Sequence, residues 1–192
     1  PSFASITPII DGHLWITGLV QKTGVLIYLD IAMHEIRRII LGEEVYAKTL
    51  SSDDTHIYLS ISDLEIPTSD KPIISIDGRT AEEVWRFVSD YQALSPILYK
   101  DNSVIFASDK NICALDITSR VTQWKHDVDV STDLTPIIRN DIVIFVGNYK
   151  EGQPLKALSI KNGRELWRIE SKDGFSRQPE IFEEIIYAVT GL

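Results

Sequence analysis

Hydrophobic positions along the chain gather in short runs rich in isoleucine, valine, tyrosine and phenylalanine. The segments 104–107 and 142–146 are examples, and polar residues such as those at 100–102 separate neighbouring runs. Runs of this length and composition are typical of β-strands, and short polar links join antiparallel neighbours. The stretch with most helical character, 31–41, runs into a glycine, so the pattern predicts an all-β chain.

Three tryptophans recur at nearly equal intervals. Trp85, Trp124 and Trp167 are separated by 39 and 43 residues. Each lies ten residues after a small residue that opens a similar segment. Self-similarity at a period of this size is the sequence signature of a repeat architecture.

A prolyl turn ahead of apolar residues repeats with the same period. Pro96, Pro136 and Pro179 are spaced by 40 and 43 residues. Pro8 opens the chain with the same phrase, 88 residues before Pro96, which is two periods of 44. The copy between them has lost its proline.

Each period holds four predicted strands, placed in the best copy at 94–99, 103–108, 111–116 and 121–126. A sheet this small leaves apolar residues on both faces, so successive sheets must stack to form a core. Period, strand number and all-β content together predict a β-propeller of four-stranded antiparallel blades with a repeat of about 44 residues. We place the repeats at about 1–44, 45–90, 91–130 and 131–173, with a partial fifth at 174–192, within a single domain 1–192.

The blade count predicts that the chain is part of a larger propeller. Its 192 residues make about 4.4 periods, whereas propellers close with typically 4–8 blades. The last copy supplies only two strands, and residue 1 is proline rather than methionine, so we expect the chain to be cut from a longer protein. A compact four-bladed ring is the alternative.

The repeated segment resembles the PQQ-like repeat of quinoprotein-type β-propellers, the quinoprotein alcohol dehydrogenase-like superfamily. That repeat also occurs in outer-membrane assembly propeller lipoproteins and in the lumenal sensor domains of stress kinases. Its pattern is a small residue, any residue, Asp, two residues, Thr-Gly, three residues and Trp. The pattern is carried here, copy by copy, by Tyr28, Asp30, Met33, His34 and Arg38, by Ser75, Asp77, Thr80, Ala81 and Trp85, by Ala114, Asp116, Ser119, Arg120 and Trp124, and by Ala157, Ser159, Asn162, Gly163 and Trp167.

The resemblance implies a structural role for these residues. The carboxylate or hydroxyl accepts backbone N–H groups in the following turn, the glycine position permits a tight turn, and the tryptophan packs against the neighbouring sheet. Stacked sheets need such a wedge in every copy, which favours packing over cofactor stacking. We assign this structural role to Asp77, Trp85, Asp116, Trp124, Gly163 and Trp167.

Dehydrogenases with this repeat hold pyrroloquinoline quinone and Ca²⁺ on the propeller axis, with a catalytic aspartate and, in many members, a disulfide between adjacent cysteines. Only the repeat is matched here, because the chain has one cysteine, Cys113, and no local motif fits the catalytic aspartate or the metal ligands. We therefore expect no cofactor and no enzymatic activity. The alternative is a fragment of a quinone-dependent dehydrogenase whose catalytic residues lie elsewhere.

Composition and charge exclude other classes of protein. The formal net charge of −9 repels nucleic acid. No run approaches the roughly 18 apolar residues of a membrane-spanning helix. The localisation stays open, with a setting outside the cytoplasm, such as the periplasm, implied by the resemblance.

Side chains with chemical potential are scattered. The four histidines, His13, His34, His56 and His126, lack metal-ligand spacing. Paired carboxylates such as Glu82 and Glu83 are adjacent, and adjacent residues of a strand point to opposite faces. Cys113 lies within a predicted strand, where we expect a buried, inert thiol.

Two segments, 62–72 and 148–154, lengthen the link between the second and third strands of their repeats. Equivalent links emerge on one rim of a propeller, and loops on a rigid scaffold often carry binding. Drift in loop length is the alternative. The candidate partner-binding residues are Leu64, Glu65, Ile66, Tyr149 and Lys150.

The sequence thus predicts a non-enzymatic propeller that acts as a rigid platform for a protein partner or another ligand. Open sheet edges would also invite further blades or self-association.

Overall fold

The computed structural model describes residues 2–6, 12–63, 71–91, 93–108, 110–128, 136–147 and 152–191. Within these ranges the chain forms strands and turns, with no helix and hence none that could span a membrane. It divides into two compact units, Pro1–Ile97 and Leu98–Leu192, and each is described by itself.

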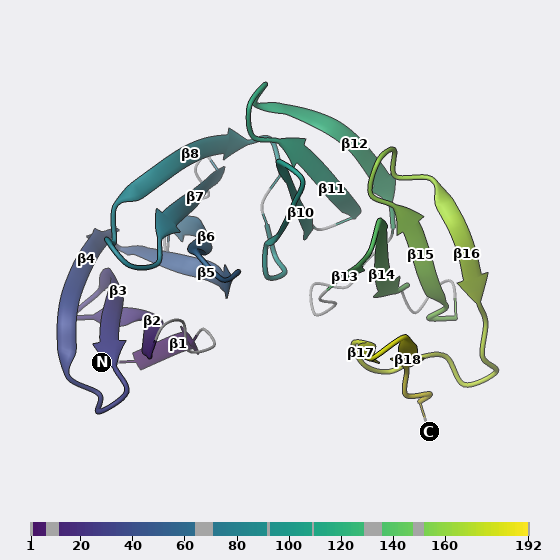
Figure 1. Ribbon diagram of the computed structural model, residues 1–192, viewed down its shortest axis with the longest axis horizontal. Helices are drawn as coiled ribbons and strands as arrows, with labels where there is room; N and C mark the ends of the chain where they lie inside the picture. The colour runs from purple at the N-terminus through teal and green to yellow at the C-terminus, as the bar shows by residue number, and fades with distance from the viewer. Residues whose placement is uncertain are drawn as a thin grey trace. The chain divides into compact units, whose positions relative to one another are not determined.

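The strands form antiparallel sheets in which chain neighbours pair in order, as Figure 1 shows. The first unit holds the first sheet, β1 (Ser2–Ile6), β2 (His13–Val20), β3 (Thr23–Asp30) and β4 (Glu35–Glu43), and the second sheet, β5 (Val45–Ser52), β6 (His56–Asp63), β7 (Lys71–Asp77) and β8 (Glu83–Ser89). The second unit holds the third sheet, β9 (Leu98–Lys100), β10 (Ser103–Ala107), β11 (Asn111–Asp116) and β12 (Val121–Asp127), the fourth sheet, β13 (Ile137–Arg139), β14 (Ile142–Val146), β15 (Leu155–Ser159) and β16 (Glu165–Ile169), and a two-stranded fifth sheet, β17 (Glu180–Phe182) and β18 (Ile185–Tyr187).

Burial within a sheet follows from stacking. Every residue of β10 is buried, because the second strand of a stacked sheet has apolar neighbours on both faces. The fourth strand, such as β12, is mostly exposed and carries charged side chains. The predicted all-β architecture of four-stranded antiparallel blades with a partial fifth is therefore confirmed.

Polar residues form the tight turn between β9 and β10, the first and second strands of the third sheet. Asp101 and Asn102 both adopt positive φ, 48° and 65°. Two consecutive residues of this kind form the hairpin turn whose twist matches the flanking strands, and Asn and Asp tolerate it better than most residues. The turn lets β9 fold directly back onto β10.

The first strand of the third repeat is shorter than predicted. We expected 94–99, whereas β9 is Leu98–Lys100. Pro96 has no N–H for a sheet ladder, and Ile97 is engaged elsewhere. Its N–H donates to Ser51 Oγ at 2.9 Å, and the Ser51 hydroxyl donates to its carbonyl at 2.5 Å. This segment thus fastens onto β5 of the second sheet before the strand begins.

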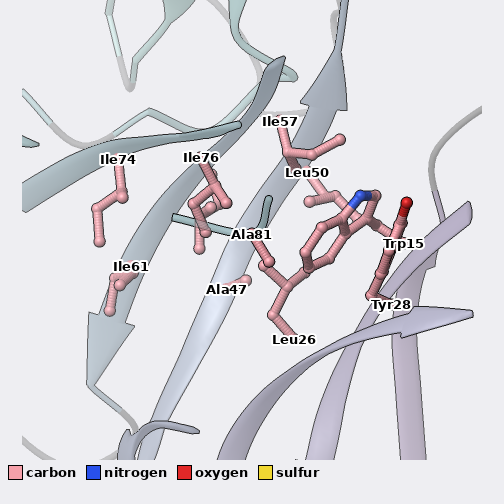
Figure 2. Close-up of a cluster of buried hydrophobic side chains, with 11 residues drawn as sticks. Trp15, Leu26, Tyr28, Ala47, Leu50, Ile57, Ile61, Ile74, Ile76 and Ala81 are labelled. Carbon is pink, nitrogen blue, oxygen red and sulfur yellow. The ribbon is translucent and has the colours of Figure 1, made fainter. Parts of the chain in front are cut away.

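The core of the first unit lies between the first and second sheets. Trp15 is fully buried, and its ring stacks on Tyr28 with centroids 4.6 Å apart. Figure 2 shows both rings beside Leu26 and Ala81, with the aliphatic side chains of the second sheet around them. Burying a ring of this size supplies a large share of the packing energy between the two sheets.

The second unit has two stacked cores. Residues of the third sheet, including Ile105 and Trp124, pack against Val143, Phe145 and Leu158 of the fourth. On its other face the fourth sheet packs Ile144 and Ala157 with Trp167 and the fifth sheet's Ile181 and Ile186. The fourth sheet is therefore buried on both sides.

Candidate functional site

The candidate partner-binding residues Leu64, Glu65, Ile66, Tyr149 and Lys150 lie outside the described residues. The described ends of β6 and β7, and of β14 and β15, flank these two links. Their role remains a prediction.

The repeat aspartates cap the turns that follow them. Asp77 Oδ1 accepts the N–H groups of Arg79 and Thr80 at 2.9 and 2.7 Å. Asp116 Oδ1 accepts the N–H of Ser119 at 2.6 Å and its hydroxyl at 2.8 Å. These bonds stabilise the charged carboxylates and hold each turn in one conformation.

The tryptophan and glycine of adjacent repeats meet between the third and fourth sheets. The Trp124 indole N–H donates to the carbonyl of Ile160 at 2.5 Å. Gly163 has φ +67°, and a Cβ added to it would lie 2.5 Å from Trp124 Cε3. The Trp124 ring therefore occupies the space that only a glycine leaves at this turn.

The other repeat tryptophans have different surroundings. Trp85 lies in β8 opposite Ser75, with its ring centroid 6.1 Å from that of Tyr58. Trp167 lies in β16 opposite Ala157 and packs into the core between the fourth and fifth sheets. Both positions belong to a sheet's outer strand.

In the first repeat, the tryptophan that packs against the next sheet comes from the second strand instead of the fourth. Trp15 on β2 donates its indole N–H to the carbonyl of Gly78 at 3.4 Å. Gly78 comes directly after Asp77, and Ile160 comes directly after Ser159, the residue at the same repeat position. Trp15 therefore donates to the carbonyl that corresponds to the Ile160 carbonyl bound by Trp124. The same cluster includes Ala81, at the glycine position of its repeat.

Our alignment of the first repeat was wrong by one residue. It placed His34 at the glycine position and Arg38 at the tryptophan position. The positive φ of 66° belongs to Met33, and Arg37 is the residue opposite Tyr28 in the ladder. The cause is a turn one residue shorter, in which the Met33 N–H donates to the carbonyl of Asp30, three residues back.

In the second unit, the basic residue that ends the first strand of one sheet bonds to the next sheet. These residues are Lys100 at the end of β9 and Arg139 at the end of β13. Lys100 Nζ donates to the carbonyl of Asn140 and lies 3.5 Å from Asp141 Oδ1. One repeat later, Arg139 donates to the carbonyl of Glu183 at 3.0 Å and to the carboxylate of Glu184 at 2.5 Å. Each cation thus reaches the first turn of the next sheet.

A groove of about 700 Å³ opens beside this contact, between the third and fourth sheets. Its lining residues are Asp101, Ser103, Gln123, Asp141, Ser159, Ile160 and Lys161. Asp101, Asp141, Ile160 and Lys161 lie on turns that join first to second or third to fourth strands, Ser103 and Ser159 lie at the strand ends beside such turns, and Gln123 lies in β12. The groove is therefore at the opposite end of the fourth sheet from the link between β14 and β15.

Hydrogen bonds hold the groove wall on the third sheet. The Ser103 hydroxyl donates to Gln123 Oε1 at 3.0 Å, and Gln123 Nε2 donates to Asp116 Oδ2 at 3.1 Å. Asn102 also donates to Asp116 Oδ2, at 3.2 Å. The wall is a satisfied polar network, which suits a rigid recognition surface.

Few side chains of the described residues offer redox, metal or nucleophilic chemistry. Within those ranges no group of three or more His, Cys, Asp or Glu side chains could hold a metal ion. Cys113 is fully buried, and burial raises the pKa of its thiol to about 11, so the reactive thiolate is scarce at neutral pH. His126 lies 3.1 Å from the Gly163 carbonyl, as part of the sheet contact.

Acid should weaken the fold through the capped turns. The N–H of Thr80 holds the pKa of Asp77 below its ordinary 3.8, and the N–H of Ser119 does so for Asp116. A carboxylate with a lowered folded-state pKa stabilises the fold above the unfolded pKa and loses that contribution as pH falls through the folded value. We expect the urea concentration at half-unfolding to decrease when the pH is lowered below about 4. The difference in that concentration between wild type and the Asp77→Asn or Asp116→Asn variant should become smaller in the same pH range. A gap independent of pH would contradict this.

Comparisons with known proteins extend the geometry. Residues 14–190 match the sequence model of a family described as outer membrane protein assembly factor BamB. Two uncharacterized proteins, from Rickettsia prowazekii (strain Madrid E) and Rickettsia conorii (strain ATCC VR-613 / Malish 7), are each 31% identical over 105 residues, 51% of this chain and 25% of the relative. This chain thus matches about a quarter of those relatives' length.

Solved structures share the fold at low sequence identity. BamB from Moraxella catarrhalis matches with a TM-score of 0.71 and 18% identity, over 97% of this chain and 57% of that one. The computationally designed Ika8 protein matches with a TM-score of 0.67 and 13% identity, over 98% of this chain and 55% of that one. Since the family match covers most of the sequence, the chain belongs to the family described as outer membrane protein assembly factor BamB, with the PQQ-like β-propeller repeat.

Proposed function

We propose that this chain is a rigid, non-enzymatic protein-binding part of a propeller that serves the assembly of outer membrane proteins outside the cytoplasm. The observation that carries the proposal is the family match over residues 14–190, whose description names that process. The partner, the compartment and the absence of a quinone cofactor are parts of this proposal.

The contacts between sheets support the platform half of the proposal. Trp124 and Lys100 of the third sheet both donate to main-chain carbonyls of the fourth, at Ile160 and Asn140. Bonds to backbone fix one sheet against the next more firmly than contacts between mobile side-chain tips. A surface that is already ordered loses little conformational entropy when it binds.

Affinity capture from membrane extracts of the source organism tests the proposal. We expect the protein to enrich membrane-embedded β-barrel proteins, with recovery falling about tenfold for a Leu64→Ala/Tyr149→Ala double variant. The thermal midpoint should not change. Val121→Ala, which shortens an apolar side chain that is 55% exposed on β12, is the matched control. Capture unaffected by the double variant would remove these loops from the proposal.

Calorimetry with pyrroloquinoline quinone and Ca²⁺ tests the dehydrogenase alternative. We expect no heat of binding from either. Tight binding of the quinone would overturn the non-enzymatic proposal.

A further inference from the structure

We propose that the groove between the third and fourth sheets binds a short peptide with free termini, about three residues long. The peptide's carboxylate caps the turn that follows Ser159, and its ammonium group pairs with Asp101. This site lies apart from the candidate partner-binding loops, and the inference does not depend on the proposed function.

The turn after Ser159 is hydrogen-bonded along its backbone in the same way as the turn after Asp77. At both turns the first residue donates its N–H to the carbonyl five residues later and accepts the N–H of the residue four positions later. The second residue donates to a carbonyl in the turn between the first and second strands of its own sheet. All six bonds measure between 2.8 and 3.0 Å. The backbone of the two turns is therefore held by one common set of bonds.

The two turns differ in their caps. Asp77 Oδ1 accepts the N–H groups two and three residues later, at 2.9 and 2.7 Å. The corresponding N–H groups belong to Lys161 and Asn162, and neither has an acceptor among the described residues. Ser159 has no carboxylate, and its hydroxyl makes no hydrogen bond within the same ranges. The fourth sheet thus presents a turn that lacks the carboxylate oxygen found in the second sheet.

Two charges that line the groove also lack partners. Neither Lys161 nor Asp101 has an ion-pair partner among the residues that the structure describes. The other lining carboxylate, that of Asp141, lies 3.5 Å from Lys100 Nζ. Lys161 belongs to the uncapped turn of the fourth sheet, whereas Asp101 belongs to the third sheet. The groove therefore has a side for an anion and a side for a cation, which a ligand carrying both charges matches.

The distance between these sides favours a peptide over a single amino acid. Stacked sheets lie about 10 Å apart, whereas an α-amino acid has both charges on one carbon. Three extended residues span about 10 Å, so a tripeptide can place its carboxylate at one sheet and its ammonium group at the other. The groove volume of about 700 Å³ lies within the usual range for small-molecule sites, about 300–1,000 Å³.

Titration of the ¹⁵N-labelled protein with triglycine, followed by NMR, tests the site. We expect the backbone amide signals of Lys161 and Asn162 to shift and to saturate. Triglycine amide lacks the carboxylate and N-acetyl-triglycine lacks the ammonium group, so each should bind about tenfold more weakly. Equal binding by either altered peptide would overturn the proposal, as would the absence of a shift at these two amides.

Substitutions at Ser159 test whether the ligand replaces the cap. Ser159→Asp and Ser159→Asn each supply an oxygen to the turn, so both should weaken triglycine binding about tenfold. The thermal midpoint of Ser159→Asp should be no lower than that of wild type, because the new carboxylate gains two N–H groups. The same two substitutions at Ser171, which follows β16 and does not line the groove, should leave binding unchanged.

The uncharged variant separates capping from charge repulsion. Weakened binding in Ser159→Asp but not in Ser159→Asn would assign the effect to charge and overturn the proposal. Asp101→Asn should weaken the binding of triglycine about tenfold but leave that of N-acetyl-triglycine unchanged, since the acetylated peptide has no cation to pair. An equal loss for both peptides would contradict the pairing with Asp101. If these titrations fail while capture from membranes succeeds, only the groove proposal is wrong.

Discussion

Replacing Trp15 by alanine is expected to lower the free energy of unfolding of the first unit by about 3–5 kcal/mol, the usual cost of truncating a large buried ring. Trp15 is fully buried between the first and second sheets, stacks on Tyr28 and donates to the Gly78 carbonyl. Its removal leaves a cavity and an unpaired carbonyl together. Urea unfolding followed by circular dichroism measures the loss without relying on tryptophan fluorescence.

Two further variants locate the origin of that loss. Trp15→Phe retains a ring but no indole N–H, so we expect it to cost about 1–3 kcal/mol. Ile36→Ala removes an apolar side chain that is half exposed in the same sheet, and should stay within about 0.5 kcal/mol of wild type. A Trp15→Ala loss as small as that of Ile36→Ala would show that Trp15 does not anchor the two sheets.

Gly163→Ala should lower the free energy of unfolding of the second unit by about 2–4 kcal/mol, because the new Cβ brings both backbone strain and a steric clash. The residue has φ +67°, which a side chain disfavours, and the new Cβ would lie 2.5 Å from Trp124 Cε3. Gly152→Ala is the matched control, since Gly152 has φ +76° but no neighbour within 4 Å of an added Cβ. The control should show only the backbone penalty, about 1 kcal/mol.

A double-mutant cycle separates the collision from the backbone strain. In a Trp124→Ala background the clash partner is gone, so Gly163→Ala should cost about as little as Gly152→Ala. The two substitutions would then be less destabilising together than the sum of each alone. Strict additivity would show that Gly163 matters for its φ alone.

The repeat was visible in the sequence because it acts through residues at fixed offsets. Trp124 and Asp116 recur with their neighbours in register, and alternation of short apolar and polar segments predicts the four strands between them. Stacking then follows, since no single sheet of this size can bury both its faces. The architecture depends on periodicity, and periodicity can be read without coordinates.

Features in which one repeat differs from the others could not be predicted from the sequence. Trp15 lies at none of the repeat offsets, and its acceptor Gly78 is 63 residues away, so only the packed structure joins them. The shorter turn at Met33 shifted our alignment of the first repeat. The polar groove was missed because Asp101 and Asp141 read as ordinary turn residues, and only stacking of two sheets brings them to one cavity.

The fastening of one sheet to the next has a consequence for biosynthesis. Each of these donors bonds to a main-chain carbonyl that lies about one repeat later in the chain. The separation is 40 residues for Lys100, 36 for Trp124 and 44 for Arg139. Such partners emerge from the ribosome within one repeat of each other, and closing a loop of that length costs little more entropy than closing a shorter one. A newly made sheet can therefore dock on its predecessor while translation continues, which shortens the time during which its apolar faces are exposed to other chains.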